Sequence, residues 1–412
     1  MMKRLILGFL ALVMLASCTG APAAQSEPLL PTAEISQTPA LTETPTETPT
    51  ATPTAVPATA TPTPTPTFTP TVTATLPYPV TGFGPSNFPA GVNPLTGLYV
   101  AKPELLNRRP VIVKVENLPR EHRPQWGLSY ADIVYEYYTE LGSTRFAAVY
   151  YGSDSEKVGP IRSARFFDFN VVRMYKANFV FGYAYADLYA QLAGSDFGNR
   201  LILEGERWAD VFTRVEPNGP NLLVANTGNL AALLSKYKMD NSRQTLDGML
   251  FQKQAPAKGQ DGTQLFMRFS GGIYNRWDYD AASGKYLRYE ETADDVNRNN
   301  EKYAQLTDRL TGKPIAFDNV VLLQVRHTQI KPPPGEVVDM QLLGEGKAWL
   351  ARDGKVYPVK WRRAKATDVI TLVNTDNTPI AFKPGQTWIE VNGLNGTASV
   401  KDGIWRFVHN MP

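Results

Sequence analysis

Residues 131–152, ADIVYEYYTELGSTRFAAVYYG, are the stretch of sequence that decides the fold. The segments 131–138 and 143–152 are rich in β-branched and aromatic residues, a composition typical of strands. The residues TELG between them form a connection short enough for a hairpin. A third segment of the same character, RPVIVKVEN at 109–117, precedes them. We therefore expect a sheet built around this hairpin.

The next stretch, EKVGPIRSARFFDF at 156–169, predicts a helix. Gly159-Pro160 is typical of a helix opening, since proline at the first helical position loses no hydrogen bond. We expect a helix from Pro160 to about residue 177. Its buried stripe would consist of Phe166, Phe167, Val171, Val172 and Tyr175.

This helix would place Arg162 and Arg165 on one face of its first two turns, close to the positive end of its dipole. Two cations there need a negative partner. Free backbone N–H groups, Ser163 and the two guanidinium groups are the ingredients of an anion pocket, with Arg145 on the preceding strand as a third arm. The alternative is internal pairing with protein carboxylates: Asp132, Glu136, Glu140 or Asp168.

The chain as a whole predicts an α+β fold. Residues 81–256 indicate a mixed α/β N-terminal module, and residues 257–412 a β-rich C-terminal module with turns such as Asp353-Gly354. One question stays open at this stage, because the strand predicted at 319–327 would also fit as a member of the first sheet.

The N-terminal residues 1–17 predict a lipoprotein signal peptide. They begin with a basic pair, continue with an apolar run of about 11 residues, and end in LASC, which matches the bacterial lipobox. Such a run is shorter than the about 20 residues that span a bilayer. Cys18, the only cysteine of the chain, would carry the lipid, which predicts anchoring at the extracytoplasmic face of a bacterial membrane. The alternative is an ordinary signal peptide with an accidental cysteine.

Residues 18–80 predict a disordered tether. Proline recurs at every second or third position and large apolar residues are almost absent, so the segment cannot form a core. A glycosylated stalk of the same sequence is the alternative.

Composition excludes some classes of function. The 42 basic and 39 acidic side chains give a formal charge of only +3, which does not favour a nucleic-acid binder. The only histidines are widely separated in sequence, so we expect neither a metal site nor a cofactor; they are His122, His327 and His409.

Several segments resemble the YerB-like family of bacterial lipoproteins. NPLTGL at 93–98, VGPIRSAR at 158–165, NVVLLQVRH at 319–327 and TWIEV at 387–391 carry this resemblance. It implies a two-part extracytoplasmic lipoprotein and brings no known catalytic residue. The chain departs from the family's expected Gly/Ser-rich segment after the arginines, where it has FGYAYADLYAQL at 181–192. If this segment lines the site, its ligand is larger or more compatible with aromatic rings.

The hypothesis favoured by these features is a non-catalytic binding module of the cell envelope. Its partners would be the membrane, through Cys18, and a cell-wall polymer or small anionic ligand, through Arg145, Arg162, Ser163 and Arg165. One alternative is a phosphotransferase acting on a lipid-pyrophosphate glycan, by loose analogy with LytR-CpsA-Psr enzymes. Another is a glycan-binding protein that uses C-terminal tryptophans, although strand alternation places most of these in the core; they are Trp277, Trp349, Trp361, Trp388 and Trp405.

Overall fold

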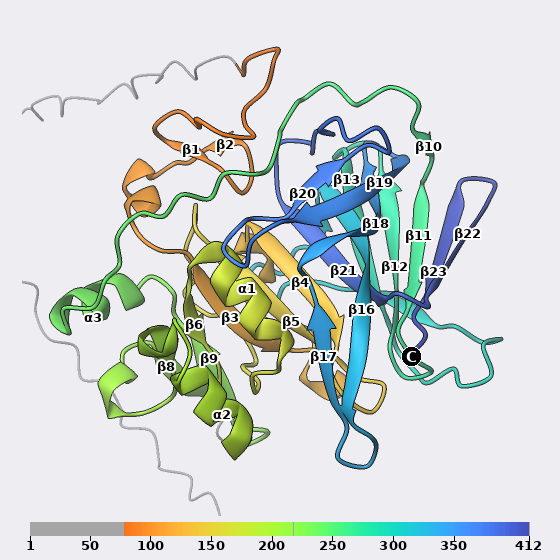
Figure 1. Ribbon diagram of the computed structural model, residues 1–412. Coiled ribbons are helices and arrows are strands. Elements are labelled where there is room, and N and C mark those ends of the chain that lie inside the picture. The colour runs from red at the N-terminus through yellow and green to blue at the C-terminus, as the bar shows by residue number, and fades with distance from the viewer. Residues whose placement is uncertain (1–77, 217, 412) are drawn as a thin grey trace, which may run out of the picture. The chain divides into compact units, whose positions relative to one another are not determined.

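A mixed sheet of twelve strands runs through the part of the protein that the computed structural model describes, residues 78–216 and 218–411 (Figure 1). The predicted hairpin lies near its centre, with Ile133 opposite Val149 and Tyr138 opposite Thr144. The strands, in spatial order, are β10 (Gln260–Asp261), β19 (Lys355–Arg363), β18 (Gly344–Arg352), β16 (Asn319–Lys331), β21 (Thr387–Gly393), β4 (Ile133–Tyr138), β5 (Thr144–Tyr150), β3 (Val111–Glu116), β6 (Asn178–Val180) and β7 (Leu201–Ile202). Two strands branch from this order: β17 (Val337–Gln341) pairs with β16, and β20 (Thr371–Val373) pairs with β19.

The strand predicted at 319–327 is part of this first sheet. It is β16, and β21 lies between it and β4 in parallel pairing with both. Strands from both predicted modules thus form one continuous sheet. The predicted signal peptide, Cys18 and nearly all of the predicted tether lie outside the described residues.

A seven-stranded sheet packs against one face of the first sheet in the described part of the chain. Its strands are β14 (Tyr303–Gln305), β13 (Lys285–Glu291), β12 (Tyr274–Asp280), β11 (Gln264–Arg268), β23 (Ile404–Val408) and β22 (Thr397–Lys401), with β15 (Ala316–Phe317) beside β13. Smaller pairs are β1 (Val92–Asn93) with β2 (Leu98–Tyr99), and β8 (Phe212–Val215) with β9 (Leu222–Ala225).

The described residues also form three α-helices, α1 (Phe167–Tyr175), α2 (Ala186–Ala193) and α3 (Leu230–Lys236), and five short 3-10 helices. Helix α1 covers the face of the large sheet opposite the small one, since Tyr135 and Tyr137 of β4 both contact Phe167. Among the residues that the structure describes, no helix has the length and apolar character required to cross a membrane.

The predicted helix start at Pro160 is wrong. Helix α1 begins at Phe167, and residues 158–164 run as extended chain instead. The backbone N–H of Arg162 donates to the carbonyl of Lys114 in β3 (3.0 Å), and that of Ala164 donates to Tyr183 after β6 (2.8 Å). Because these long-range bonds occupy the backbone, the local Gly-Pro pattern is overridden. The predicted buried stripe holds from Phe167 onward, whereas Phe166 is only partly buried.

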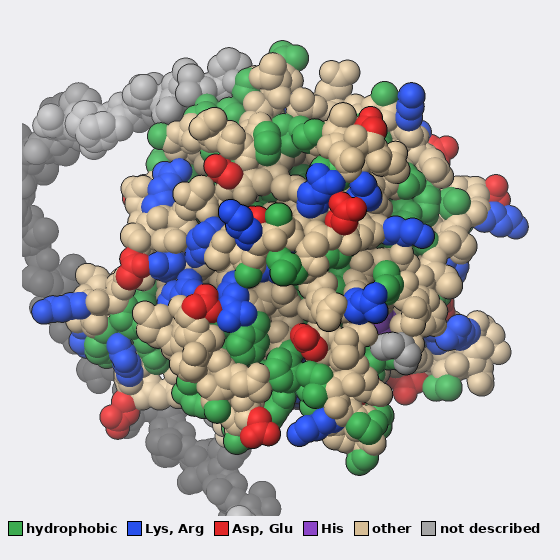
Figure 2. Space-filling view, viewed as in Figure 1, with side chains coloured by type: hydrophobic (Ala, Val, Ile, Leu, Met, Phe, Trp, Pro, Cys, Tyr) green, Lys and Arg blue, Asp and Glu red, His purple; other side chains and the backbone are tan. Residues whose placement is uncertain are grey.

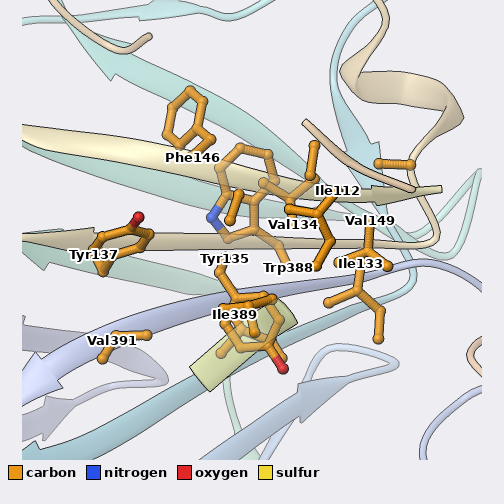
Figure 3. Packing of buried hydrophobic residues seen from close by; sticks show 14 of the residues in the cluster. Ile112, Ile133, Val134, Tyr135, Tyr137, Phe146, Val149, Trp388, Ile389 and Val391 are labelled. Carbon is orange, nitrogen blue, oxygen red and sulfur yellow. The ribbon is translucent and has the colours of Figure 1, made fainter. Parts of the chain in front are cut away.

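The core combines aromatic and aliphatic side chains, and Figure 3 shows Trp388, Phe146 and Tyr135 among isoleucines and valines. Trp388 of β21 is fully buried and contacts Phe146 and Trp277 with ring centroids 5.1 and 5.3 Å apart. Trp361 and Trp405 are buried as well. The rings of these four tryptophans are occupied by the core, whereas Trp349 is only partly buried. Glycan binding through the C-terminal aromatic residues therefore stays a prediction.

Arg288 of β13 is the charged residue that joins the two sheets. Its fully buried guanidinium donates to Glu390 of β21 (2.9 Å) and Glu290 of its own strand (2.7 Å), and it pairs with Glu136 of β4 at 2.5 Å. The same group lies 4.2 Å from the centre of the Trp388 ring. Burial is the main reason that the pKa of Glu136 is raised well above its ordinary value, and the charge of Arg288 opposes this.

We expect Arg288→Met to lower the free energy of unfolding by about 3–5 kcal/mol, because it leaves buried carboxylates without their cation. Urea denaturation followed by tryptophan fluorescence measures the loss. Arg276→Met, on neighbouring β12 and paired with Asp278 at the partly exposed surface, is the matched control and should cost less than about 1 kcal/mol. Equal stability of the two variants would contradict the assigned role of Arg288.

Candidate functional site

The candidate site lies at one edge of the large sheet, where several parallel strands end. Strands β3 and β4 both run antiparallel to β5, and β6 and β21 run parallel to them. Their carboxyl ends therefore meet at the same edge, which is where open sheets with parallel strands commonly bind ligands. The extended segment 161–165, IRSAR, crosses this edge between β3 and β6.

Arg162 is the most exposed cation of the site. Its side chain is 42% exposed and donates to Glu116 at the end of β3 (2.9 Å), a carboxylate that also contacts His122 (3.0 Å). Burial raises the pKa of Glu116, while the charge of Arg162 works in the opposite direction. Arg162 is thus tied to the protein by one carboxylate and still reaches solvent.

Arg145 and Arg165 share a single carboxylate, Glu140, in the turn between β4 and β5. Arg145 donates to its Oε1 (2.8 Å) and Arg165 to its Oε2 (2.5 Å). Burial alone would raise the pKa of Glu140, but the two guanidinium groups hold it below its usual value. The pKa of Arg145 is lowered to about 10, mainly by burial and next by the positive charge of Arg165.

Lys114 lies beneath these arginines and is completely buried. Its Nζ contacts Asp168 of α1 (3.2 Å) and the face of the Tyr137 ring (4.0 Å). Asp168 also accepts hydrogen bonds from the Tyr137 hydroxyl and from the backbone N–H of Arg165. Burial lowers the pKa of Lys114 to about 7; Asp168 opposes this shift, and the arginines add to it.

Positive charge exceeds negative charge in this cluster. When all groups are ionised, four cations face three carboxylates; they are Lys114, Arg145, Arg162 and Arg165 against Glu116, Glu140 and Asp168. A cavity of about 290 Å³ opens beside it, and its charged lining consists of the cations Arg165 and Lys331 and the carboxylates Glu140 and Glu336. The arrangement has the charge and the space to accept an anion.

The predicted acidic partners are distributed differently from the expectation. Glu140 pairs with two arginines, and Asp168 receives the backbone N–H of Arg165. Glu136 faces the other side of β4, toward Arg288. Asp132 lies before β4, at the opposite edge, where it accepts the backbone N–H groups of residues 151 and 152 at 2.7 and 2.9 Å. Neither Asp132 nor Glu136 is bonded to Arg145, Arg162 or Arg165.

Ser163 lies between Arg162 and Arg165 and is partly exposed, and its carbonyl accepts from Arg145 (2.9 Å). Within the described part of the chain, its hydroxyl has no hydrogen-bond partner. Because α1 begins only at Phe167, the helix-dipole argument does not apply to Arg162. The predicted residues still come together, through strand pairing.

Sequence reasoning missed Lys114, Glu116 and His122. Lys114 and Glu116 are two apart in the strand VIVKVE, which is otherwise apolar and buried throughout. Two charged residues on one face of a buried strand indicate buried partners, so this pattern held the missing information.

Two of the three histidines, distant in sequence, are close in the structure. The rings of His327 and His409 have centroids 4.9 Å apart, and burial lowers their pKa values to about 4 and about 3. Among the described residues, no group of three or more His, Cys, Asp or Glu side chains is arranged to hold a metal.

Comparison with known proteins gives matches along most of the folded region. Residues 95–240 match the N-terminal domain of a family described as protein of unknown function (DUF3048), and residues 265–389 match its C-terminal domain. The protein described as "Putative lipoprotein YerB" from Bacillus subtilis (strain 168) is 28% identical over 313 residues, which cover 75% of this chain and 88% of that protein. The crystal structure of YerB from Bacillus subtilis superposes with a TM-score of 0.60 at 26% identity, covering 73% of this chain and 95% of that chain.

We expect Lys114→Met to change how stability depends on pH. Between about pH 7 and the ordinary lysine pKa of 10.5, the unfolded chain holds a proton that folded Lys114 has released. The free energy of unfolding should therefore rise with pH in this window, and Lys114→Met should remove at least about 1 kcal/mol of that rise. Urea denaturation at intervals from pH 7 to 9.5 measures it.

Exposed Lys236→Met on α3 is the control and should keep the wild-type slope. If the free energy of unfolding of Lys114→Met depends on pH as in the wild type, Lys114 stays protonated across this pH range.

Proposed function

This chain belongs to the DUF3048 family of proteins of unknown function, and we propose that it is a lipid-anchored extracytoplasmic protein that binds an anionic ligand of the cell envelope. The ligand's phosphate or carboxylate would be held by Arg162 and Arg165, with Arg145 and Ser163 beside them. The role is binding, and the proposal includes no catalytic step.

One observation carries the binding proposal: the two guanidinium groups of Arg145 and Arg165 have one carboxylate between them. The backbone carbonyls of Ser163 and Ala164 accept further hydrogen bonds from Arg145 and Arg165, but a single carboxylate carries one negative charge, so Glu140 cannot neutralise both guanidinium groups. The proximity of like charges is also one reason for the lowered pKa of Arg145. An additional anion would relieve this repulsion and form charge-assisted hydrogen bonds.

The neighbourhood of Arg162 supports the same proposal. With its side chain 42% exposed, this guanidinium faces solvent on one side and Glu116 on the other. Pairing with Glu116 holds the group in place before a ligand arrives, which reduces the entropy lost on binding. Arg162 and Arg165 would then approach one anion from two directions.

The phosphotransferase alternative loses its main support. The analogy is based on a strand that bears an acid, Asp132, followed by a hairpin and an arginine-bearing loop. In the structure, Asp132 lies at the other edge of the sheet from the arginines. Lys114, whose pKa of about 7 would suit proton transfer, has a completely buried side chain and cannot touch a substrate in this structure. A binding module requires neither group to react.

Anchoring at the membrane is supported by the lipobox that ends in Cys18 and by the relative described as a lipoprotein. A diacylglycerol on this cysteine supplies two acyl chains, which is enough for stable anchoring. The Pro/Thr-rich residues that follow would act as a spacer between the membrane and the folded part.

We expect the purified full-length protein to bind inorganic phosphate, and Arg162→Gln and Arg165→Gln to weaken this binding at least tenfold each. Isothermal titration calorimetry at low ionic strength measures the affinity. Arg214→Gln is the matched control, because Arg214 is exposed and paired with Glu204 away from the site. If Arg214→Gln weakened phosphate binding to the same extent, the effect would come from the loss of a positive charge in general, and this would contradict the site.

We expect Cys18→Ser to move the protein from the detergent phase to the aqueous phase in Triton X-114 partitioning of expressing bacteria. Metabolic labelling with a fatty acid should mark the wild type and not the variant. Labelling of both proteins would place the lipid elsewhere.

A further inference from the structure

A groove continues from the proposed anion site along β17. The cavity of about 290 Å³ beside Arg165 and a second cavity of about 820 Å³ share Phe166 as a wall, and β17 lines both. The opposite wall of the second cavity comes from α1 and α2. In Figure 2, hydrophobic side chains are exposed in the region between α2 and the β16–β17 hairpin of Figure 1. These volumes are in the range of about 300–1,000 Å³ that is typical of ligand pockets.

The walls of the groove combine aromatic rings with polar groups. Phe166 and Phe169 are stacked with ring centroids 6.2 Å apart, and the Tyr185 ring lies 6.5 Å from Phe166. Polar side chains surround these rings, namely the amide of Gln191, the hydroxyl of Ser195, the carboxylate of Asp339 and the guanidinium of Arg173. Aromatic faces with hydrogen-bonding groups around them suit a sugar ring, which has an apolar face and a periphery of hydroxyls.

Aromatic residues also lie directly beside the arginines. The segment after β6 is bonded to the IRSAR segment, since the backbone N–H of Gly182 donates to Arg162 (3.0 Å). Its next residue, Tyr183, is 64% exposed, and Tyr185 lines the first cavity together with Arg165. Tyr185 of the aromatic segment 181–192 therefore lines the cavity beside Arg165.

We infer that the ligand of Arg162 and Arg165 is an acidic saccharide. This inference rests on the proposed function and names its ligand class. The phosphate or carboxylate of the saccharide would pair with the guanidinium groups, and its sugar rings would extend along the groove against Tyr185, Phe166 and Phe169.

A peptide is less well suited to this groove. An extended peptide would bind by adding a strand to the edge of β17. Part of that edge is already occupied, because Asn170 of α1 donates to the carbonyl of Met340 (3.0 Å). The Asn170 amide in turn accepts from Arg363 (3.0 Å), so it is not free to move aside.

The test compares binding of glucose 1-phosphate, glucuronate, glucose and inorganic phosphate to the full-length protein by calorimetry. Glucose 1-phosphate should bind at least tenfold more tightly than phosphate. Phe166→Leu and Tyr185→Leu should each remove most of this advantage and leave the affinity for phosphate within twofold of wild type. Tyr237→Leu, at the C-terminal end of α3 and outside both cavities, is the matched control and should keep both affinities.

The two proposals fail in different ways. If phosphate binds but glucose 1-phosphate and glucuronate bind no more tightly, the ligand is not a saccharide and the anion site stands. If the advantage persists in both Leu variants, the sugar does not occupy this groove and the inference is overturned. Tighter binding of an acidic peptide than of either saccharide also overturns it, and no binding of any anion overturns the proposed function itself.

Discussion

The fold depends on the buried guanidinium of Arg288 and its position between two sheets. Its strand belongs to the small sheet, whereas Glu136 and Glu390 belong to neighbouring strands of the large one. A buried ion pair of this kind adds little net stability compared with apolar packing, but a partner left alone is very costly, so the pairing favours one arrangement of the sheets. Three carboxylates around one cation also leave Oε2 of Glu290 and of Glu390 without a hydrogen-bond partner in the described part of the chain. Burial and mutual repulsion therefore favour retention of a proton by the cluster, in keeping with the raised pKa of Glu136.

This arrangement of the sheets determines where the candidate site lies. On β4, alternate residues face opposite sides, so Glu136 points to Arg288 while Tyr137 points to Lys114 and Asp168. The turn that follows β4 carries Glu140, the carboxylate shared by two arginines. Strand β4 thus connects the ionic cluster that holds the sheets to the ionic cluster that faces solvent.

The site combines internal ion pairs with an excess of positive charge. From the sequence, we treated two roles of the arginines as alternatives: pairing with carboxylates of the protein, or binding an anionic ligand. The structure has both features, because Glu116 and Glu140 hold the guanidinium groups in position without neutralising all of them. Such prior ordering suits recognition of an anion, since little side-chain entropy is lost when the ligand arrives. The aromatic groove beside it would then decide which anion is preferred.

The sequence by itself determined the elements whose signals are local, namely the central hairpin and the buried face of α1 from Phe167 onward. It also led to the expectation that the arginines meet a negative partner, although from a helix start that the structure contradicts. It also indicated that most C-terminal tryptophans belong to the core, which their burial confirms. Only the tertiary structure decided the start of α1, since the backbone around Arg162 is held by β3 and β6 rather than by its own neighbours. It likewise decided the partners of the charges and the single sheet formed by both halves of the chain, because parallel pairing of β21 with β4 joins residues more than two hundred positions apart. Pairing between distant strands does not affect the local pattern of apolar and polar residues. The edge of the sheet at which a charged residue lies is therefore known only from the tertiary structure.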